Sequence, residues 1–262
     1  MVSKFIFKYI FIYIIVSIMD SVRILKTEMS VTNIDNVVEK LILGDDISVA
    51  ICNSNTLVRC YKDKELNKIV SSFDIKCTDG FPVAKASKIL YQNNQRRVDG
   101  YKLFLQTIEK GLNDNVSHYF FGNSEQIVLK MIDNIRSKYG DVNIKGFTCP
   151  PNLSYKELAN EKYINDINAK NPDILWVSLG FPKQEKFINL IKKNNMIKTN
   201  MIGVGAVFEW VAGTKIKAPE WLANIGLEWL LRLIQEPKRL FRRYLVDNFL
   251  FIIYFIKQYI RN

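Results

Sequence analysis

Short, unbroken apolar runs alternate with amphipathic stretches along the chain from about residue 22 onward. Apolar runs of this length are typical of buried strands. The predicted strands are VRIL (22–25), ISVAIC (47–52), FDIKC (73–77), HYFF (118–121), VNIKGF (142–147), DILWVSL (173–179) and NMIGV (200–204). Strands and helices that alternate at this spacing are typical of parallel α/β proteins, and strands without polar alternation are expected where helices cover both faces of the sheet. The pattern therefore predicts an α/β fold of that kind.

The stretches between the predicted strands carry apolar residues at helical spacing. The first helix has Thr32 or Asn33 as its cap and repeats apolar residues every three or four positions after it. SYKE (154–157) is typical of a capping box, in which a serine and a glutamate satisfy each other's backbone N–H groups at a helix start. Further helices are predicted at 57–71, 84–91, 103–110, 124–138, 154–169 and 183–194.

Four polar or glycine-rich segments begin where predicted strands end. They are TDGF (78–81), FGNSE (121–125), LGFPKQE (179–185) and GVGAVF (203–208). In open α/β sheets, ligands bind beyond the carboxyl ends of the strands, so these segments are expected to share one rim. Any one of them alone reads as an ordinary turn or helix cap, but four on one rim favour a binding site.

The segment LGFPKQE is predicted to aim a helix N-terminus at that rim. Gly180 lets the backbone turn tightly, and Pro182 is suited to the first helical turn. Gln184 and Glu185 then project at the helix start, where free N–H groups favour a phosphate or sugar oxygen. We expect Gln184 to be free to hydrogen-bond a sugar or acceptor hydroxyl, and Glu185 to hold a neighbouring cation.

The composition limits the chemistry. The 262 residues carry a net charge of +11, which points to an anionic partner: nucleic acid, anionic lipid or a phosphorylated substrate. The four cysteines form no C-x-x-C pair and His118 is the single histidine, so a structural zinc site and a Ser-His-Asp hydrolase are disfavoured. The cysteines fit small core residues of a reducing compartment, and His118 is predicted to be structural.

Asp79 is the best candidate for a catalytic base. It directly follows an apolar strand, where partial desolvation would raise the pKa of its carboxyl. Arg96 and Arg97, in NNQRRVDG, could offer paired donors to a phosphate. The alternatives are an Asp-Gly turn for Asp79 and a solvated loop for the two arginines.

Other nucleotide motifs are incomplete or missing. GVGAVF resembles the start of a G-x-G-x-x-G dinucleotide fingerprint, but Phe208 occupies the third glycine position and the motif lies late in the chain. A dinucleotide-dependent nucleotide-sugar oxidoreductase therefore stays an alternative. The sequence contains no P-loop motif and no D-x-D motif, which argues against a metal-bridged sugar-nucleotide site of the usual kind.

The two ends of the chain differ from the middle. Residues 1–19 are strongly apolar and are interpreted as a membrane anchor, an element packed on the domain, or an artefact of the start site. Residues 218–245 mix tryptophans with basic residues, and 249–256 are apolar, which fits an interfacial membrane helix. A docked core helix, an oligomer interface or a basic nucleic-acid-binding module are the alternatives. The predicted division is 1–20, 21–215 and 216–262.

Several segments together resemble one glycosyltransferase family. They are TDGFPVAKASKIL, QRRVDG, PDILWVSLGFPKQEKFI, IGVGAVFEWVAGTKIKAP and GLEWLLRLIQEPKRLFRRYL. In order and spacing these resemble the WecG/TagA/CpsF family across about residues 22–245. The resemblance implies a Rossmann-like core with a helical C-terminal appendage that meets the membrane. It also implies metal-independent, inverting transfer of N-acetylmannosamine, its uronic acid or a related hexose from a UDP-sugar to a sugar on a polyprenyl diphosphate, in teichoic acid, capsule or exopolysaccharide synthesis.

The resemblance also assigns roles by position. Asp79 matches the family's general base, and Arg97 matches an arginine near the leaving diphosphate or sugar. Appendage arginines are expected to close over the nucleotide. The predicted substrate-binding residues are Asn53, Gly80, Gln184, Glu185, Glu209, Arg232, Arg239 and Arg242. Ile51, Lys102 and Glu209 differ from the residues that are usual at these positions in the family. These differences bear on which sugar is used more than on the type of reaction.

The implied partners follow from this reaction. They are a UDP-sugar donor, a lipid-linked sugar acceptor and an anionic membrane surface, with no cofactor, no metal and no nucleic acid. The implied location is the cytoplasm, at the inner face of the cell membrane. A homo-oligomer is left open.

Overall fold

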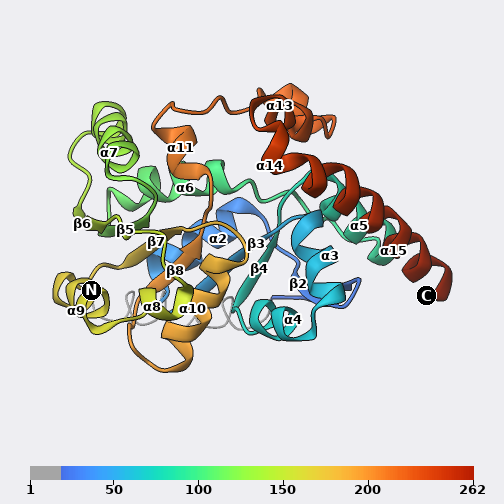
Figure 1. The fold of residues 1–262 in the computed structure, drawn as a ribbon, viewed down its shortest axis with the longest axis horizontal. Helices are drawn as coiled ribbons and strands as arrows, with labels where there is room; N and C mark the ends of the chain where they lie inside the picture. The colour runs from blue at the N-terminus through green and yellow to red at the C-terminus, as the bar shows by residue number, and fades with distance from the viewer. Residues whose placement is uncertain (1–18) are drawn as a thin grey trace, which may run out of the picture.

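Six parallel strands form the central sheet of the structure, a computed structural model that describes residues 19–262 (Figure 1). All of their pairings are parallel. Across the sheet the strands follow the order β4 (Ile75–Thr78), β3 (Ser48–Cys52), β8 (Asn200–Gly203), β7 (Ile174–Ser178), β5 (His118–Gly122) and β6 (Ile144–Thr148). The predicted Rossmann-like α/β fold is therefore confirmed. The interpretations of residues 1–18 lie outside the described part of the chain.

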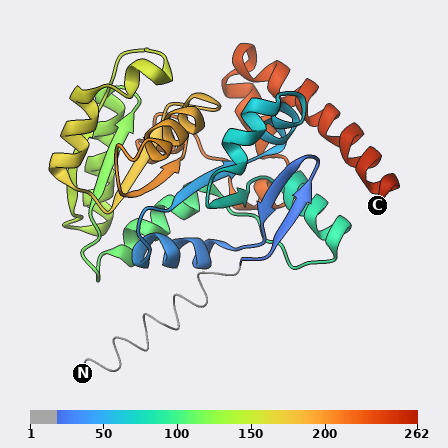
Figure 2. The same cartoon turned by 90° about the horizontal axis from the view of Figure 1, so that it is seen from below.

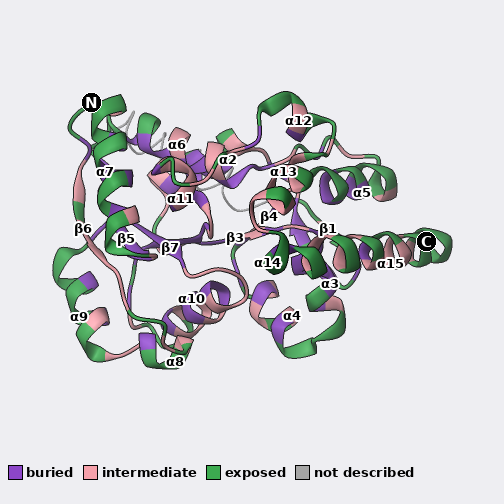
Figure 3. Cartoon of the chain, turned by 45° about the horizontal axis from the view of Figure 1, so that its top comes forward, coloured by how far each residue is buried: buried purple, intermediate pink, exposed green. Residues whose placement is uncertain are grey.

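Helices cover both faces of this sheet because the strand side chains are apolar on both sides (Figure 2). In β7, Leu175 and Val177 enter one core cluster while Ile174 and Trp176 enter the other. The first cluster is covered by α3 (Ser54–Lys62), α4 (Lys64–Ser71), α8 (Tyr155–Leu158), α9 (Glu161–Lys170) and α10 (Lys183–Lys193). The second is covered by α2 (Ile34–Leu43), α6 (Gly100–Gly111), α7 (Glu125–Tyr139) and α11 (Val207–Val211). Buried residues are accordingly gathered in the strands and on the helix faces turned toward them (Figure 3).

The first predicted strand does not join the main sheet. It forms β1 (Ser21–Ile24), which pairs antiparallel with β2 (Thr27–Ser30), a strand that the apolar pattern missed because its residues are mostly polar. The hairpin lies beside the β4 edge, where the Lys76 N–H donates to Ser30 Oγ over 3.1 Å.

Two predicted helices are each broken in two by a capping side chain. Asp63 accepts hydrogen bonds from the backbone N–H groups of Glu65 and Leu66, which starts α4. Asn160 accepts from the Tyr163 N–H and starts α9. Short polar side chains compete for backbone N–H groups in this way, so a helix predicted from apolar spacing alone runs through such a break. The predicted capping box at Ser154 is present.

The C-terminal segment, residues 216–262, is helical. It comprises α12 (Glu220–Asn224), α13 (Glu228–Gln235), α14 (Pro237–Phe241), the wide turn η1 (Arg242–Val246) and α15 (Asp247–Arg261). Helix α15 lies along α3 and extends outward from the domain (Figure 1). Phe251 is buried in the first core cluster, and the rings of Tyr61 and Tyr254 stack with centroids 4.2 Å apart. Helix α5 (Phe81–Tyr91) follows β4 in the chain.

Candidate active site

The carboxyl ends of five strands border one cavity of about 360 Å³, here called the main cavity. The residue that directly follows each of the five strands lines it, namely Asn53, Asp79, Asn123, Leu179 and Val204. Strands β5 and β7 are neighbours in the sheet, but the chain leads from β5 to β6 on one side and from β7 to β8 on the other. Such a topological switch point leaves a crevice at the carboxyl ends of the strands. The predicted convergence of the four strand-end segments is confirmed.

Arg97 is held against Asp79 inside this cavity. Its Nε lies 3.3 Å from Asp79 Oδ1, and its Nη2 lies 2.7 Å from Asp99 Oδ2. The same Nη2 donates to Glu228, which belongs to α13 of the C-terminal segment. The Asp79 and Arg97 side chains are 24% and 20% exposed, so both are reachable from the cavity.

A buried amide fixes the loop that carries Arg97. Gln95 is 1% exposed, and its Nε2 donates to Thr32 O and to Thr78 Oγ1, each over 2.8 Å. The backbone N–H of Val98 donates to Thr78 O over 2.9 Å. Since Thr78 ends the strand that delivers Asp79, these bonds bring the loop alongside the candidate base.

Lys217 completes a cluster of charged groups. Its Nζ lies 2.9 Å from Asp99 Oδ2 and 2.7 Å from Glu228 Oε1. The cluster therefore joins three carboxylates, from Asp79, Asp99 and Glu228, to two cations, Arg97 and Lys217. Its charges link the end of β4 to the C-terminal segment.

The two aspartates of this cluster have pKa values shifted in opposite directions. Burial raises the pKa of Asp79, Arg97 opposes that rise, and the carboxylates of Asp99 and Glu228 add to it. Burial also disfavours ionised Asp99, but Lys217 and Arg97 hold its pKa below the usual value. Asp79 is thus the carboxyl whose proton affinity is raised, as expected of a general base.

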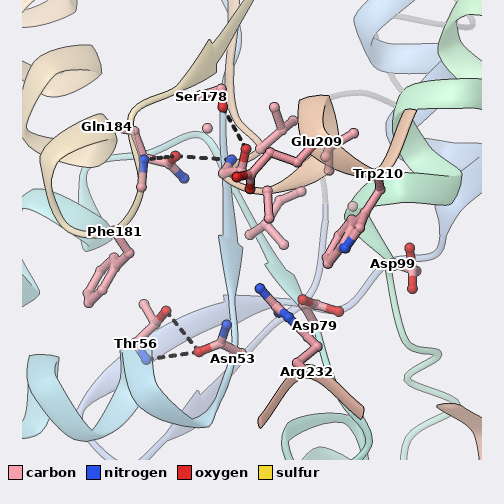
Figure 4. Close-up of a pocket in the computed structure, with 18 of the residues that line it drawn as sticks. Asn53, Thr56, Asp79, Asp99, Ser178, Phe181, Gln184, Glu209, Trp210 and Arg232 are labelled. Carbon is pink, nitrogen blue, oxygen red and sulfur yellow. Dashed lines mark hydrogen bonds between the residues drawn. The ribbon is translucent and has the colours of Figure 1, made fainter. Parts of the chain in front are cut away.

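Asn53 begins α3 and faces the main cavity. Its Oδ1 accepts a hydrogen bond from the backbone N–H of Thr56 over 3.2 Å, which caps the helix. The amide nitrogen is left to point into the cavity (Figure 4). The helix cap therefore orients a free N–H donor toward any ligand there.

Gln184 lines the main cavity, but its amide is used by the protein. Its Oε1 accepts hydrogen bonds from the backbone N–H groups of Gly180 and Gly205, each over 3.1 Å, and its Nε2 donates to Glu185 Oε1 over 3.0 Å. A side chain on Gly203 would meet Gln184 Nε2 at 2.6 Å, so a larger residue there would displace the Gln184 amide from its hydrogen bonds. The expectation of a free amide is wrong for the oxygen, which joins the loops after β7 and β8. The amide nitrogen has a second N–H, for which the described residues show no partner.

Glu185 is buried next to it, at 2% exposure. Burial raises the pKa of its carboxyl to about 7, and the Gln184 amide partly offsets this. Within residues 19–262 its Oε2 has no hydrogen-bond partner and the carboxylate makes no ion pair. Arg243 and Arg59 lie close enough for their charges to lower the pKa of Glu185, so the expected neighbouring cations are present without a direct ion pair among residues 19–262.

Three arginines of the C-terminal segment line the main cavity: Arg232, Arg239 and Arg243. Arg242 does not; it borders a separate groove on the outer side of α3 and α14 with Arg59 and Lys62. Arg239 and Arg243 are four positions apart and lie on the same face of the helical segment, which is the spacing that brings both to the cavity. Arg242 therefore stays a prediction that the lining of the main cavity does not support, and Arg243, which was not predicted, lines that cavity.

Trp210 stands between two cations on the cavity wall. The Arg232 guanidinium and the Lys217 Nζ each lie 4.8 Å from its ring centroid. Glu209 also lines the cavity and pairs with Lys215 over 2.7 Å. The sequence analysis did not predict four further residues that line the cavity: Asp99, Trp210, Lys217 and Glu228. Asp99 and Glu228 belong to the segments QRRVDG and GLEW, but the sequence did not show what they contact.

The remaining sequence predictions resolve as follows. Gly80 precedes α5 with a φ of 87°, and it lines a smaller pocket beside the main cavity instead. His118 is structural, as predicted: it is 1% exposed, accepts a hydrogen bond from Trp176 Nε1, and burial lowers its pKa to about 4. Phe208, at the third position of the dinucleotide fingerprint, is fully buried among aromatic rings, which leaves that alternative unsupported.

Comparison with known proteins gives a consistent result. The model of the glycosyl transferase WecG/TagA/CpsF family matches residues 21–262. An N-acetylglucosaminyldiphosphoundecaprenol N-acetyl-beta-D-mannosaminyltransferase of Bacillus subtilis (strain 168) is 26% identical over 219 residues, covering 80% of each chain. A protein of the same description from Staphylococcus aureus (strain MW2) is 27% identical over 184 residues, covering 70% of each chain.

Proposed function

This chain belongs to the WecG/TagA/CpsF family of glycosyltransferases, and from that membership and the geometry of its site we propose the reaction that it catalyses. The donor is a UDP-sugar carrying N-acetylmannosamine or a closely related hexose. The acceptor is N-acetylglucosamine linked through a diphosphate to a polyprenyl lipid. This is the acceptor class in the descriptions of the Bacillus and Staphylococcus relatives. The product belongs to the assembly of teichoic acid or another cell-surface polysaccharide.

The observation that supports the proposal is that Asp79, a carboxyl group of raised pKa, lies beside the Arg97 guanidinium in the main cavity. Asp79 takes the proton of the acceptor hydroxyl while that oxygen attacks the anomeric carbon of the donor. The bond from this carbon to the diphosphate oxygen breaks, and UDP leaves with the electron pair. Attack opposite the leaving group inverts the anomeric configuration. Asp79 is accessible from the cavity, and Arg97 fixes the orientation of its carboxylate.

The arginines of the C-terminal segment supply positive charge where the leaving diphosphate gains negative charge. Arg232 and Arg243 line the main cavity without an ion pair within the described residues. Guanidinium groups match phosphate oxygens in geometry and stay charged, so they stabilise such a leaving group without a metal ion. The Asn53 amide adds a neutral donor for a sugar or phosphate oxygen.

The proposal is tested by a donor screen. Purified protein is incubated with lipid-linked N-acetylglucosamine and each of several UDP-sugars, and the mass of the lipid product is measured by mass spectrometry. We expect a gain of one N-acetylhexosamine with UDP-N-acetylmannosamine or a related donor. Absence of transfer with every donor, from a protein whose folding has been verified, would contradict the proposal.

We also propose that the C-terminal segment meets the membrane. Among residues 19–262, the structure has no helix with the length and apolarity required to cross a bilayer. Helix α15 nevertheless exposes a row of large apolar residues at helical spacing, Phe249, Ile252, Ile256 and Ile260. Basic residues flank this row, and a helix of that kind favours the interface of an anionic leaflet.

Replacing Phe249, Ile252, Ile256 and Ile260 together with serine should reduce binding to vesicles that contain phosphatidylglycerol by about 10-fold or more. Substitution is preferable to deletion, because Phe251 and Tyr254 of the same helix pack on the domain. Co-sedimentation measures the bound fraction. A control variant with serine at Leu112 and Leu129, which are exposed elsewhere, should bind as the parent does. Equal binding by both variants would place the membrane contact elsewhere.

A further inference from the structure

A second pocket adjoins the main cavity, and Asp79 lies in the wall between them. Six residues line both spaces: Asn53, Asp79, Arg97, Glu228, Arg232 and Arg243. On its own side the second pocket is bordered by the start of α5 and by the C-terminal segment. The base candidate is therefore reachable from two directions.

The walls of the two spaces differ in chemistry. The second pocket alone is lined by three aromatic side chains, Phe81, Trp229 and Tyr244. Phe81 is 40% exposed, and the Trp229 and Tyr244 rings lie 6.1 Å apart between centroids. Aromatic faces pack against the C–H faces of a sugar ring, and a few amides beside them give hydroxyl specificity. The Asn53 and Asn248 side chains supply such amides.

We propose that the second pocket receives the hydroxyl edge of the acceptor's sugar ring, with the ring lying against the aromatic side chains of Phe81, Trp229 and Tyr244. This inference rests on the proposed transfer reaction. A general base must contact the acceptor hydroxyl while that hydroxyl faces the donor's anomeric carbon. One carboxylate meets both conditions when it lies in the wall between the two substrates, which is the position of Asp79.

The C-terminal segment supplies half of the residues that line this pocket. Gly226 has a φ of 81°, and a side chain there would meet the Phe81 ring at 3.1 Å. The close approach of that backbone to Phe81 places Trp229 opposite the start of α5. Two of the three aromatic residues thus come from the segment that also supplies the cavity arginines, so the same segment contributes to both sites.

The size of the pocket indicates how much of the acceptor enters. Its volume is about 80 Å³, which is room for roughly two to three water molecules. That space takes the hydroxyl edge of one sugar ring. The diphosphate and lipid of the acceptor stay at the mouth of the pocket.

The test is steady-state kinetics with a water-soluble acceptor, N-acetylglucosaminyl diphosphate carrying a short alkyl chain. Phe81→Leu and Trp229→Leu should each raise the acceptor KM about 10-fold or more and leave the donor KM within about 2-fold. Phe81→Tyr and Trp229→Phe, which keep the ring, should recover most of the affinity. Trp221→Leu is the matched control, since Trp221 is 66% exposed on the same segment and lines neither space.

The outcomes separate this proposal from the proposed function. A parent enzyme that transfers sugar while Phe81→Leu and Trp229→Leu keep the parent's acceptor KM would overturn the pocket assignment and leave the reaction intact. A donor KM that rises in place of the acceptor KM would overturn it as well. Absence of transfer by the parent contradicts the proposed function itself. Thermal unfolding of each variant verifies the fold. Should Trp229→Leu unfold, Phe81→Leu carries the test, since the Phe81 side chain is 40% exposed.

Discussion

Asp79→Asn is expected to lower the rate of sugar transfer by about 10²-fold or more. Asparagine keeps the size of the side chain and can still accept from Arg97, but it cannot take the acceptor's proton. Burial raises the pKa of Asp79, so its charged form costs folding free energy above the unfolded-state value of about 3.8. The variant should consequently be at least as stable as the parent at pH 7. Initial rates and thermal unfolding are the two measurements.

Two further results bear on the same residue. Because the base acts when ionised, kcat/KM of the parent should fall as the pH drops through the raised pKa of Asp79. Asp35→Asn, an exposed carboxylate on α2 paired with Lys110, is the matched control and should keep full activity. Unchanged turnover in Asp79→Asn would remove this residue from the mechanism.

The sequence predicted the position of the site because strand ends are local signals. Apolar runs that end in polar residues mark where each strand stops, and parallel strands bring those ends to one edge. Asn53, Asp79 and Val204 reach the main cavity for this reason alone. The resemblance then indicated what the cavity does, which the strand pattern did not.

The partners of the side chains depended on long-range packing that the sequence does not mark. Arg97 contacts Glu228 across 131 positions of sequence, and no local pattern pairs them. Gln184 was expected to face a ligand, but the loop after β8 passes close enough to use its amide. Arg243, not Arg242, lines the main cavity with Arg239, and the roles assigned by position did not use this helical spacing. Backbone placement was therefore predictable here, and side-chain pairing was not.

Arg97→Ala should produce the second large effect, on both stability and activity. The side chain is mostly buried and contacts Asp79, Asp99 and Glu228, so its removal leaves three carboxylates with Lys217 as their single cation in the cluster. Removing one partner of a buried charge cluster typically costs about 3–5 kcal/mol. Denaturant unfolding measures this loss. We also expect transfer to fall by about 10²-fold or more, since the base loses its orientation.

The direction of the pH effect distinguishes this role from a simple loss of folding. Arg97 lowers the pKa of Asp79, so in Arg97→Ala that pKa should rise further. The acid limb of kcat/KM should move to higher pH in the folded fraction, whereas unfolding alone would scale the whole profile. Arg96→Ala is the matched control, because Arg96 is the exposed neighbour of Arg97 and lies outside the main cavity. If the Arg96 and Arg97 variants lost activity equally, the charge cluster would not be what positions the base. A large loss confined to Arg97→Ala, with the acid limb at higher pH, would show that the Arg97 guanidinium controls the ionisation of Asp79.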